Sequence, residues 1–147
     1  TPADNSYRKS PLDVPSATFP EKASEFEAQT AIGGGPVLIN KGKIVDTWKE
    51  ELFEVGGVEP ASSQPRTAVG VTSDKKMIMF VCEGRNMTEG VKGMTTAEVA
   101  EILKDLGCVE AINLDGGGST CMLVNGKETI KVSDGAQRAV ASAVYFK

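Results

Sequence analysis

Residues 113–120, Asn-Leu-Asp-Gly-Gly-Gly-Ser-Thr, place one carboxylate, three glycines and two hydroxyls between two apolar segments. Glycine has no Cβ, so a ligand can approach its backbone closely, and it also adopts the positive φ angles of tight turns. The pattern has two interpretations that the loop alone does not separate. Either Asp115 braces a tight turn through the loop's own N–H groups, or Asp115 and backbone N–H groups converge on an anion or a sugar.

Asp115 itself is suited to three roles, namely general acid or base, ligand of a hard metal ion, or brace of the turn. The run superficially resembles a phosphate loop. It lacks the Gly-Lys-Ser/Thr ending of that motif, however, and no helical pattern follows it. We therefore do not expect a nucleotide-binding P-loop.

The absence of histidine from the chain excludes several kinds of active site. Ser-His-Asp, Cys-His and H-E-x-x-H chemistry all need a histidine. The odd number of cysteines without C-x-x-C spacing fits neither a disulfide scaffold nor a zinc site. Any catalysis by this chain must therefore use carboxylates, lysine, arginine, tyrosine, backbone dipoles or a hard metal ion.

Arginine is scarce, and its rigid fork suits bidentate binding of phosphate or carboxylate. Three arginines adjoin predicted strand ends: Arg66, Arg85 and Arg138. If these ends gather at one rim of a sheet, the three side chains flank Asp115. The alternative is that each makes a structural ion pair with one of the 20 acidic residues. Glu83 and Asp134 are further carboxylates at strand ends, which either pair with Asp115 or lie in solvent.

Length and composition bound the class of protein. With 147 residues, 40% hydrophobic and 24% charged, the chain fits a single soluble globular domain. The net charge of −4 argues against a nucleic-acid partner, whose surface is normally basic. No apolar run is long enough to cross a bilayer. Because the sequence begins with Thr1, we expect a processed or trimmed N-terminus, which is compatible with a removed export signal.

One helix is well specified, over residues 96–106. Thr95 and Glu98 form a capping box, an apolar stripe recurs with helical period, and Gly107 provides the stop. The four prolines in residues 1–20 predict a linker or strap, and residues 21–29 have the composition of a short helix. The mixed residues 46–65 predict a long irregular loop, with one helical turn near residues 49–52.

Apolar segments between turn residues predict about eight strands. These are residues 37–39, 44–45, 66–71, 77–82, 109–114, 121–124, 128–132 and 140–146. Residues 77–82 are apolar without alternation, so we expect that strand to be covered on both faces. Asn125 and Gly126 predict a two-residue hairpin turn. The fold class expected is α+β, a mostly antiparallel sheet with one amphipathic helix packed on it.

Four stretches resemble the phosphodiester glycosidase family in order and spacing. They are Gly-Gly-Gly-Pro-Val-Leu-Ile at 33–39, Arg-Thr-Ala-Val-Gly at 66–70, Asn-Leu-Asp-Gly-Gly-Gly-Ser-Thr at 113–120 and Gln-Arg-Ala-Val-Ala-Ser-Ala at 137–143. The similarity covers residues 30–147, expected to be the C-terminal major part of the family's domain. Residues 1–29 show no counterpart of its earlier region, so we expect either that the chain is a fragment or that another polypeptide segment completes the sheet.

The resemblance implies a hydrolase that cleaves a sugar-1-phosphodiester at the anomeric bond. Asp115 would lie near the anomeric carbon, as acid/base or as a stabiliser of oxocarbenium character, and Arg66 and Arg138 would hold the phosphate. The other residues that the resemblance assigns to substrate binding are Gly34, Gly35, Thr67, Arg85, Asn113, Gly116, Gly117, Gly118 and Ser119.

The resemblance also implies an exported protein that acts on a sugar phosphate or a phosphodiester-linked glycan. It permits a divalent cation, calcium above all, among carboxylates and carbonyls. Two other functions stay open. The chain is alternatively a non-catalytic binder of an anionic glycan or cell-envelope polymer, or a structural piece of a larger exported protein.

Overall fold

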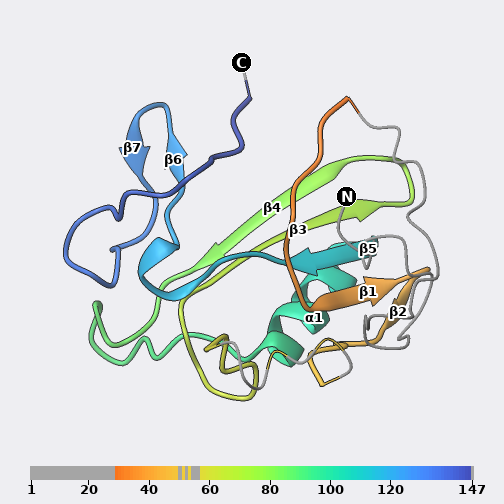
Figure 1. Cartoon of the computed structure of the whole chain (residues 1–147), viewed down its shortest axis with the longest axis horizontal. Coiled ribbons are helices and arrows are strands. Elements are labelled where there is room, and N and C mark those ends of the chain that lie inside the picture. Colours follow the sequence, from red (N-terminus) through yellow and green to blue (C-terminus); the bar gives the residue numbers. More distant parts are fainter. Residues whose placement is uncertain (1–28, 50, 52, 54–56, 147) are drawn as a thin grey trace, which may run out of the picture.

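The computed structural model describes residues 29–49, 51, 53 and 57–146 (Figure 1). The strap and short helix predicted for residues 1–29 lie, except for residue 29, outside the described residues. The described elements are β1 (Val37–Asn40), β2 (Lys43–Ile44), β3 (Arg66–Thr72), β4 (Met77–Cys82), α1 (Thr96–Asp105), β5 (Cys108–Asn113), the 3₁₀ turn η2 (Gly117–Ser119), β6 (Leu123–Val124) and β7 (Lys127–Glu128).

Five strands form one sheet in the order β2-β1-β5-β3-β4, and every neighbouring pair is antiparallel. The helix α1 packs against β5, β1 and β3 on one face of this sheet (Figure 1). It is the one α-helix in the described part of the chain. The predicted α+β fold, a mostly antiparallel sheet with a single packed helix, is confirmed.

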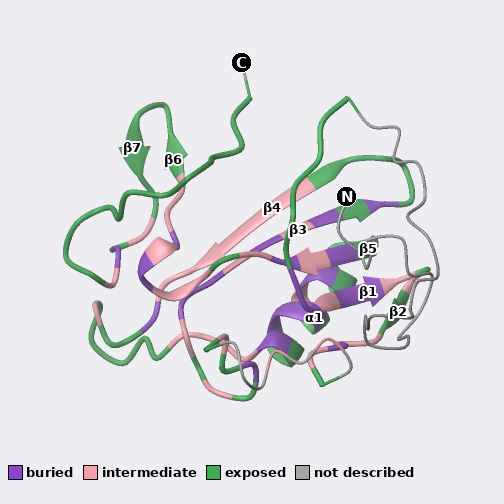
Figure 2. Cartoon of the chain, in the orientation of Figure 1, coloured by how far each residue is buried: buried purple, intermediate pink, exposed green. Residues whose placement is uncertain are grey.

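The helix begins as the sequence predicts. The Thr95 side chain accepts a hydrogen bond from the Glu98 N–H, and the Glu98 carboxylate accepts one from the Thr95 N–H at 2.7 Å. Leu106, the last residue of the predicted helix, is instead the C-cap and is 52% exposed. The core lies between helix and sheet (Figure 2) and consists of Leu38, Ile39, Ala68, Val99, Ala100, Leu103, Cys108 and Ala111.

The prediction that residues 77–82 are covered on both faces is wrong. β4 is an edge strand, beyond the central strands that α1 covers. Met77 is 52% exposed, and the other five residues are partly exposed. An unbroken apolar run therefore does not by itself indicate a central strand.

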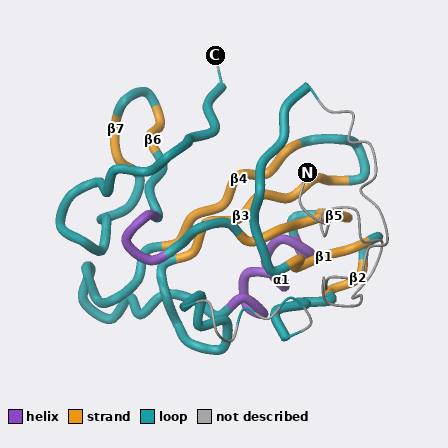
Figure 3. Tube along the Cα trace, in the orientation of Figure 1, coloured by secondary structure: helices purple, strands orange, loops and turns teal. Residues whose placement is uncertain are grey.

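The C-terminal segment, residues 121–146, contains less regular structure than predicted. Its hairpin does turn at Asn125 and Gly126, both with positive φ, but β6 and β7 have only two residues each. Residues 140–146 form no strand, because among the described residues no strand offers a hydrogen-bonded ladder to them. The segment lies to one side of the five-stranded sheet and consists mostly of loop (Figures 1 and 3).

The long loop predicted before β3 is irregular where the structure describes it. The Glu51 N–H donates to the Thr47 carbonyl at 2.9 Å, a single bond of helical type close to the predicted turn. No described helix has the length and apolar character needed to span a membrane.

Candidate active site

The antiparallel register gathers four segments at one end of the sheet. Arg66, the first residue of β3, pairs with Cys82, the last of β4, while Ala68 pairs with Asn113 at the end of β5. Val37 at the start of β1 pairs with Ile112. The segments before β1 and β3 and after β4 and β5 therefore lie together. This meets the condition, stated from the sequence, that the strand ends gather at one rim.

A cavity of about 490 Å³ opens at this end of the sheet. That volume is within the range of small-molecule sites. Two glycine-rich segments, residues 33–35 and 116–117, form part of its wall. The full lining is Gly33, Gly34, Gly35, Phe53, Gly57, Val58, Gln64, Arg66, Arg85, Asn113, Leu114, Asp115, Gly116 and Gly117.

The cavity brings together eight residues that the sequence assigned to the site. They are Gly34, Gly35, Arg66, Arg85, Asn113, Asp115, Gly116 and Gly117. Four others do not line it. Thr67 donates instead to the Thr120 hydroxyl at 3.3 Å, and Gly118, Ser119 and Arg138 belong to an adjoining cluster described below.

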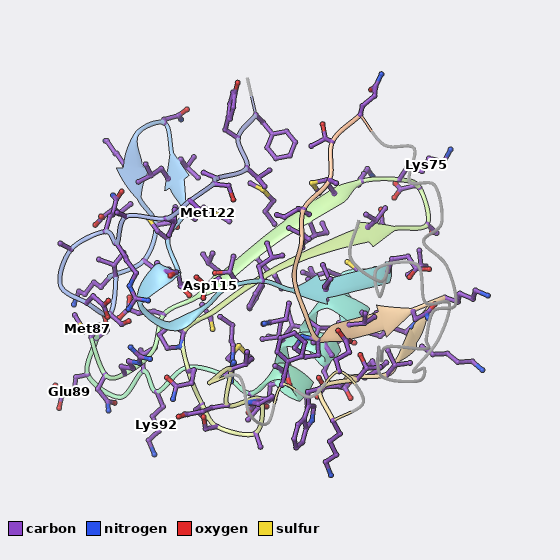
Figure 4. The ribbon with its side chains drawn as sticks, viewed as in Figure 1. Lys75, Met87, Glu89, Lys92, Asp115 and Met122 are labelled. Carbon is purple, nitrogen blue, oxygen red and sulfur yellow. The ribbon has the colours of Figure 1, made fainter. Side chains whose placement is uncertain are left out.

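Asp115 is exposed on the cavity wall, beyond the end of β5 (Figure 4). Its carboxylate makes no hydrogen bond or ion pair with another described residue. The turn is held otherwise, because the Gly117 N–H donates to the Pro65 carbonyl at 2.9 Å and the Ser119 N–H to the Gly116 carbonyl at 3.0 Å. Among the described residues, Asp115 therefore does not brace its own loop through its carboxylate.

Asn113 holds the first glycine segment, residues 33–35, against the end of β5. It is 2% exposed, and its amide donates to the carbonyls of Gly35, at 2.9 Å, and Leu114, at 2.8 Å. The Gly35 N–H returns a bond of 2.7 Å to the Asn113 carbonyl. A Cβ on Gly34 would stand 2.5 Å from that same carbonyl oxygen, so only glycine lets the chain pass this close to β5.

Arg66 was predicted to hold a phosphate, but most of its donors are already used. The side chain is buried, with the residue 2% exposed. Its guanidinium donates at 2.7–2.8 Å to four backbone carbonyls, those of Val58, Glu59, Ser62 and Met94. Burial lowers the pKa of Arg66 from its usual value. The geometry thus gives Arg66 the task of fixing the loop that forms one wall of the cavity.

The Arg85 guanidinium is more available to a ligand than that of Arg66. It is on the cavity wall, and its side chain is 45% exposed. Nε donates to the Gln64 side-chain oxygen at 3.0 Å, and Nη1 to the Ser133 hydroxyl at 3.4 Å. Its backbone φ of 57° is left-handed, which points to a constrained loop position.

Arg138, Asp134 and Ser119 form a cluster beside the glycine loop. Arg138 binds Oδ2 of Asp134 through Nε, at 3.0 Å, and Nη2, at 2.5 Å, and its Nη1 lies 3.4 Å from the Ser119 hydroxyl. The second Asp134 oxygen lies 3.7 Å from Arg85 Nη1. The alternative interpretation, a structural ion pair, therefore applies to Arg85 and Arg138, and one carboxylate serves both.

Neither of the other two carboxylates at strand ends pairs with Asp115 among the described contacts. Asp134 is taken by the arginines. Glu83 accepts the backbone N–H of Lys131 at 2.9 Å, which links the end of β4 to the C-terminal segment. Hydrogen bonds from Thr88 and Lys131 hold the pKa of Glu83 below its usual value.

The donor set does not fit the calcium ion that the resemblance permits. Calcium takes six to eight oxygen ligands, several of them carboxylates. In the described residues no three acidic, cysteine or histidine side chains lie close enough to hold a metal. We therefore derive no chemical step through a metal.

Several lining residues were not predicted, among them Phe53, Val58 and Gln64. They lie in or beside the long loop before β3, where no motif or periodicity marks them. The Arg66 contacts, and the backbone hydrogen bonds of Pro60 to Thr96 and of Gln64 to Met94, show how that loop is folded. The signal that was available is the length of the loop in a compact domain. It indicates that the loop has a function, but it does not indicate which of its residues line the site.

Comparison with known proteins indicates the family to which the chain belongs. The family model described as phosphodiester glycosidase matches residues 10–147, so the match begins before the residue 30 at which the resemblance was placed. The uncharacterized prophage-derived protein YomE of Bacillus subtilis is 35% identical over 80 residues, which are 54% of this chain and 12% of that protein.

Mouse N-acetylglucosamine-1-phosphodiester alpha-N-acetylglucosaminidase is 34% identical over 108 residues, 72% of this chain and 20% of that enzyme. The catalytic domain of the zebrafish enzyme superposes with a TM-score of 0.58 at 34% identity, covering 69% of this chain and 34% of that one. The chain thus spans a fifth or less of the curated relatives it matches. The family model matches almost the whole chain, and the glycine loop of that family resemblance lies on a cavity. This protein belongs to the phosphodiester glycosidase family.

Proposed function

We propose that this protein is a hydrolase that cleaves a sugar-1-phosphodiester at the bond to the anomeric carbon. One observation carries the proposal. Asp115 and Arg85, a carboxylate and a partly exposed cation, line the same cavity. The wall of that cavity includes both glycine segments. Such a pair suits a substrate with a sugar at one end and a phosphate at the other.

In the proposed reaction, water replaces the phosphate at the anomeric carbon, and the products are the free sugar and a phosphate monoester. Arg85 binds the phosphate oxygens and neutralises the charge that grows as the C–O bond breaks. Asp115 activates the water or stabilises oxocarbenium character. Because a phosphate monoester leaves readily, little protonation of the leaving group is needed. Here Arg85 takes the phosphate in place of the predicted Arg66, whose donors bind carbonyls.

Asp115→Asn tests this function. The measurement is sugar release from a panel of sugar-1-phosphodiesters, with circular dichroism to verify the fold. We expect kcat to fall by about 10²–10⁴, the range for removing a positioned acid or base. Asp74→Asn, in the β3–β4 turn, is the matched control and should keep full activity. Full activity of Asp115→Asn would refute the assignment of Asp115.

A second function is favoured by one specific observation. Among the described lining residues Asp115 is the single carboxylate, whereas glycosidases usually employ two. A non-catalytic binder of an anionic glycan needs only the cation and the groove. It would show saturable binding without turnover, weakened by Arg85→Ala and little changed by Asp115→Asn.

The cellular setting belongs to the proposal as well. A phosphodiester-linked glycan at the cell surface or in the envelope is the substrate class that matches the cavity and the family, and we propose export on that ground. Fractionation of cells that express the whole protein, followed by immunodetection, tests it.

A further inference from the structure

We propose that Asp134 is a positioning residue. It holds Arg85 and Arg138 beside the glycine loop, so that Arg85 presents Nη2 to a phosphate in the cavity. This inference rests on the proposed function, because it concerns how the same cavity binds the phosphate group.

The first support is that the two oxygens of Asp134 serve different arginines. Oδ2 binds Arg138 through two nitrogens, and Oδ1 faces Arg85 Nη1 at 3.7 Å. Two guanidinium groups this close repel each other, and a shared carboxylate offsets the repulsion. All three side chains are about 36–48% exposed, so the contribution of the cluster to global stability is small. Its consequence is the orientation of the two arginines.

The second support is the way in which Arg85 is held. Nε is bound to Gln64, and Nη1 is directed to Ser133 and Asp134. Nη2 makes no hydrogen bond to another described residue, and it would lie only 3.0 Å from a Cβ on Gly117, on the cavity wall. Three contacts thus fix one side of the fork and leave the other side for a ligand.

The third support is the place of Asp134 itself. Arg85 lines the cavity and Asp134 does not. The carboxylate therefore does not occupy the position where a phosphate would bind, which distinguishes a positioning residue from an internal competitor. Orientation of a binding side chain by a neighbour behind it is the usual means of keeping a site within a fraction of an ångström of its working geometry.

The glycine loop is fitted to this pair. A Cβ on Gly118 would stand 2.2 Å from both Arg138 Nη2 and Asp134 Oδ2. The loop that follows Asp115 can therefore rest directly against the ion pair, and only glycine permits it. The pair consequently supports the position of the loop as well as that of Arg85.

The test measures binding of inorganic phosphate by calorimetry to the wild-type protein, Asp134→Asn, Arg85→Gln and the double variant. We expect Asp134→Asn to weaken binding about fivefold to tenfold, the size of a coupling between contacting groups. In the Arg85→Gln background the same change should have no further effect, because Asp134 acts through Arg85. Asp74→Asn is the control for loss of a surface carboxylate and should bind as the wild type does.

Asp134→Ser provides a second variant that also removes the carboxylate, and it should weaken phosphate binding in the same way, which keeps the test decisive if Asp134→Asn does not fold. Gln64→Ala removes another support of Arg85 and should also weaken phosphate binding. Unchanged or tighter binding by folded Asp134→Asn would overturn the inference, as would equal losses in the presence and absence of Arg85, or a wild-type protein that binds no phosphate. The proposed function fails separately, when phosphate binds and no phosphodiester is hydrolysed.

Discussion

Two regions of the molecule contain similar apolar side chains but bury them to different extents. One is the sheet together with α1, and the other is the C-terminal segment. In the first region Leu38, Val99 and Leu103 are fully buried between helix and sheet. In the second, Tyr145 and Phe146 are 76% and 65% exposed. The sheet and helix have each other to pack against, whereas within the described structure the C-terminal tail has no such layer.

The difference shows where the fold gets its stability and where the site gets its parts. Burial stabilises a protein in proportion to the apolar area removed from water, so the sheet and α1 supply most of it. The C-terminal segment contributes Asp134 and Arg138, which pair with each other beside the glycine loop; Asp134 also pairs with Arg85, and Arg138 donates to the Ser119 hydroxyl. The site is therefore assembled from one rigid region and one region held mainly by polar contacts.

The largest effect on stability is expected from Arg66→Ala, on the rigid side of the comparison. The change leaves four backbone carbonyls without their charged donor. Removing one partner from a buried charged network costs about 3–5 kcal/mol, and urea unfolding measures it. A loss below about 1 kcal/mol would show that the loop before β3 does not depend on Arg66.

Leu103→Ala tests the apolar part of the same region. Leu103 is fully buried among β-strand side chains, and truncation of such a leucine costs about 2–5 kcal/mol. Chemical denaturation followed by far-UV circular dichroism is the measurement. Leu106→Ala is the matched control on the same helix, because Leu106 is half exposed, and it should change stability much less.

The pH dependence of stability sharpens the comparison at the start of α1. Hydrogen bonds from Thr95 lower the pKa of Glu98 below its usual 4.5. A depressed carboxyl pKa stabilises the fold above the unfolded value, and this stabilisation is lost as pH falls through the folded value. Between pH 5 and pH 3 the wild type should therefore lose more stability than Glu98→Gln. Glu101→Gln, also on α1, should follow the wild type, and identical pH profiles for all three proteins would contradict the assignment.

The smallest effect is expected from Phe146→Ala, on the other side of the comparison. Phe146 is 65% exposed, and truncation of a mostly exposed side chain changes stability by no more than about 0.5 kcal/mol. A loss as large as that of Leu103→Ala, in the same unfolding experiment, would break the comparison. It would mean that the tail is part of the core.

Local features of the fold could be predicted because they depend on neighbouring residues. The capping box of Thr95 and Glu98, and the turn at Asn125 and Gly126, are signals of this kind. The strand expected over residues 140–146 was not found, since a strand exists only where another strand supplies its hydrogen bonds. Apolar composition alone does not identify that partner.

The candidate site was predictable in its position and less so in its assignments. The glycine motif and strand-end arginines indicated one rim, and the register brings them there. Which arginine faces a ligand was not predictable. Arg66 and Arg85 have the same chemistry in sequence, and they differ because the carbonyls of the irregular loop before β3 converge on the Arg66 guanidinium and not on that of Arg85.

The turn between β3 and β4 offers a position for attaching a probe. The strands that carry the site run away from it, so Lys75, exposed in the turn, lies at the end of the sheet opposite Asp115 (Figure 4). Lys75→Cys followed by attachment of a fluorophore or surface linker would place the probe far from the cavity. Immobilised protein and free protein should then bind ligands alike, which makes this turn the natural point for coupling the molecule to a sensor.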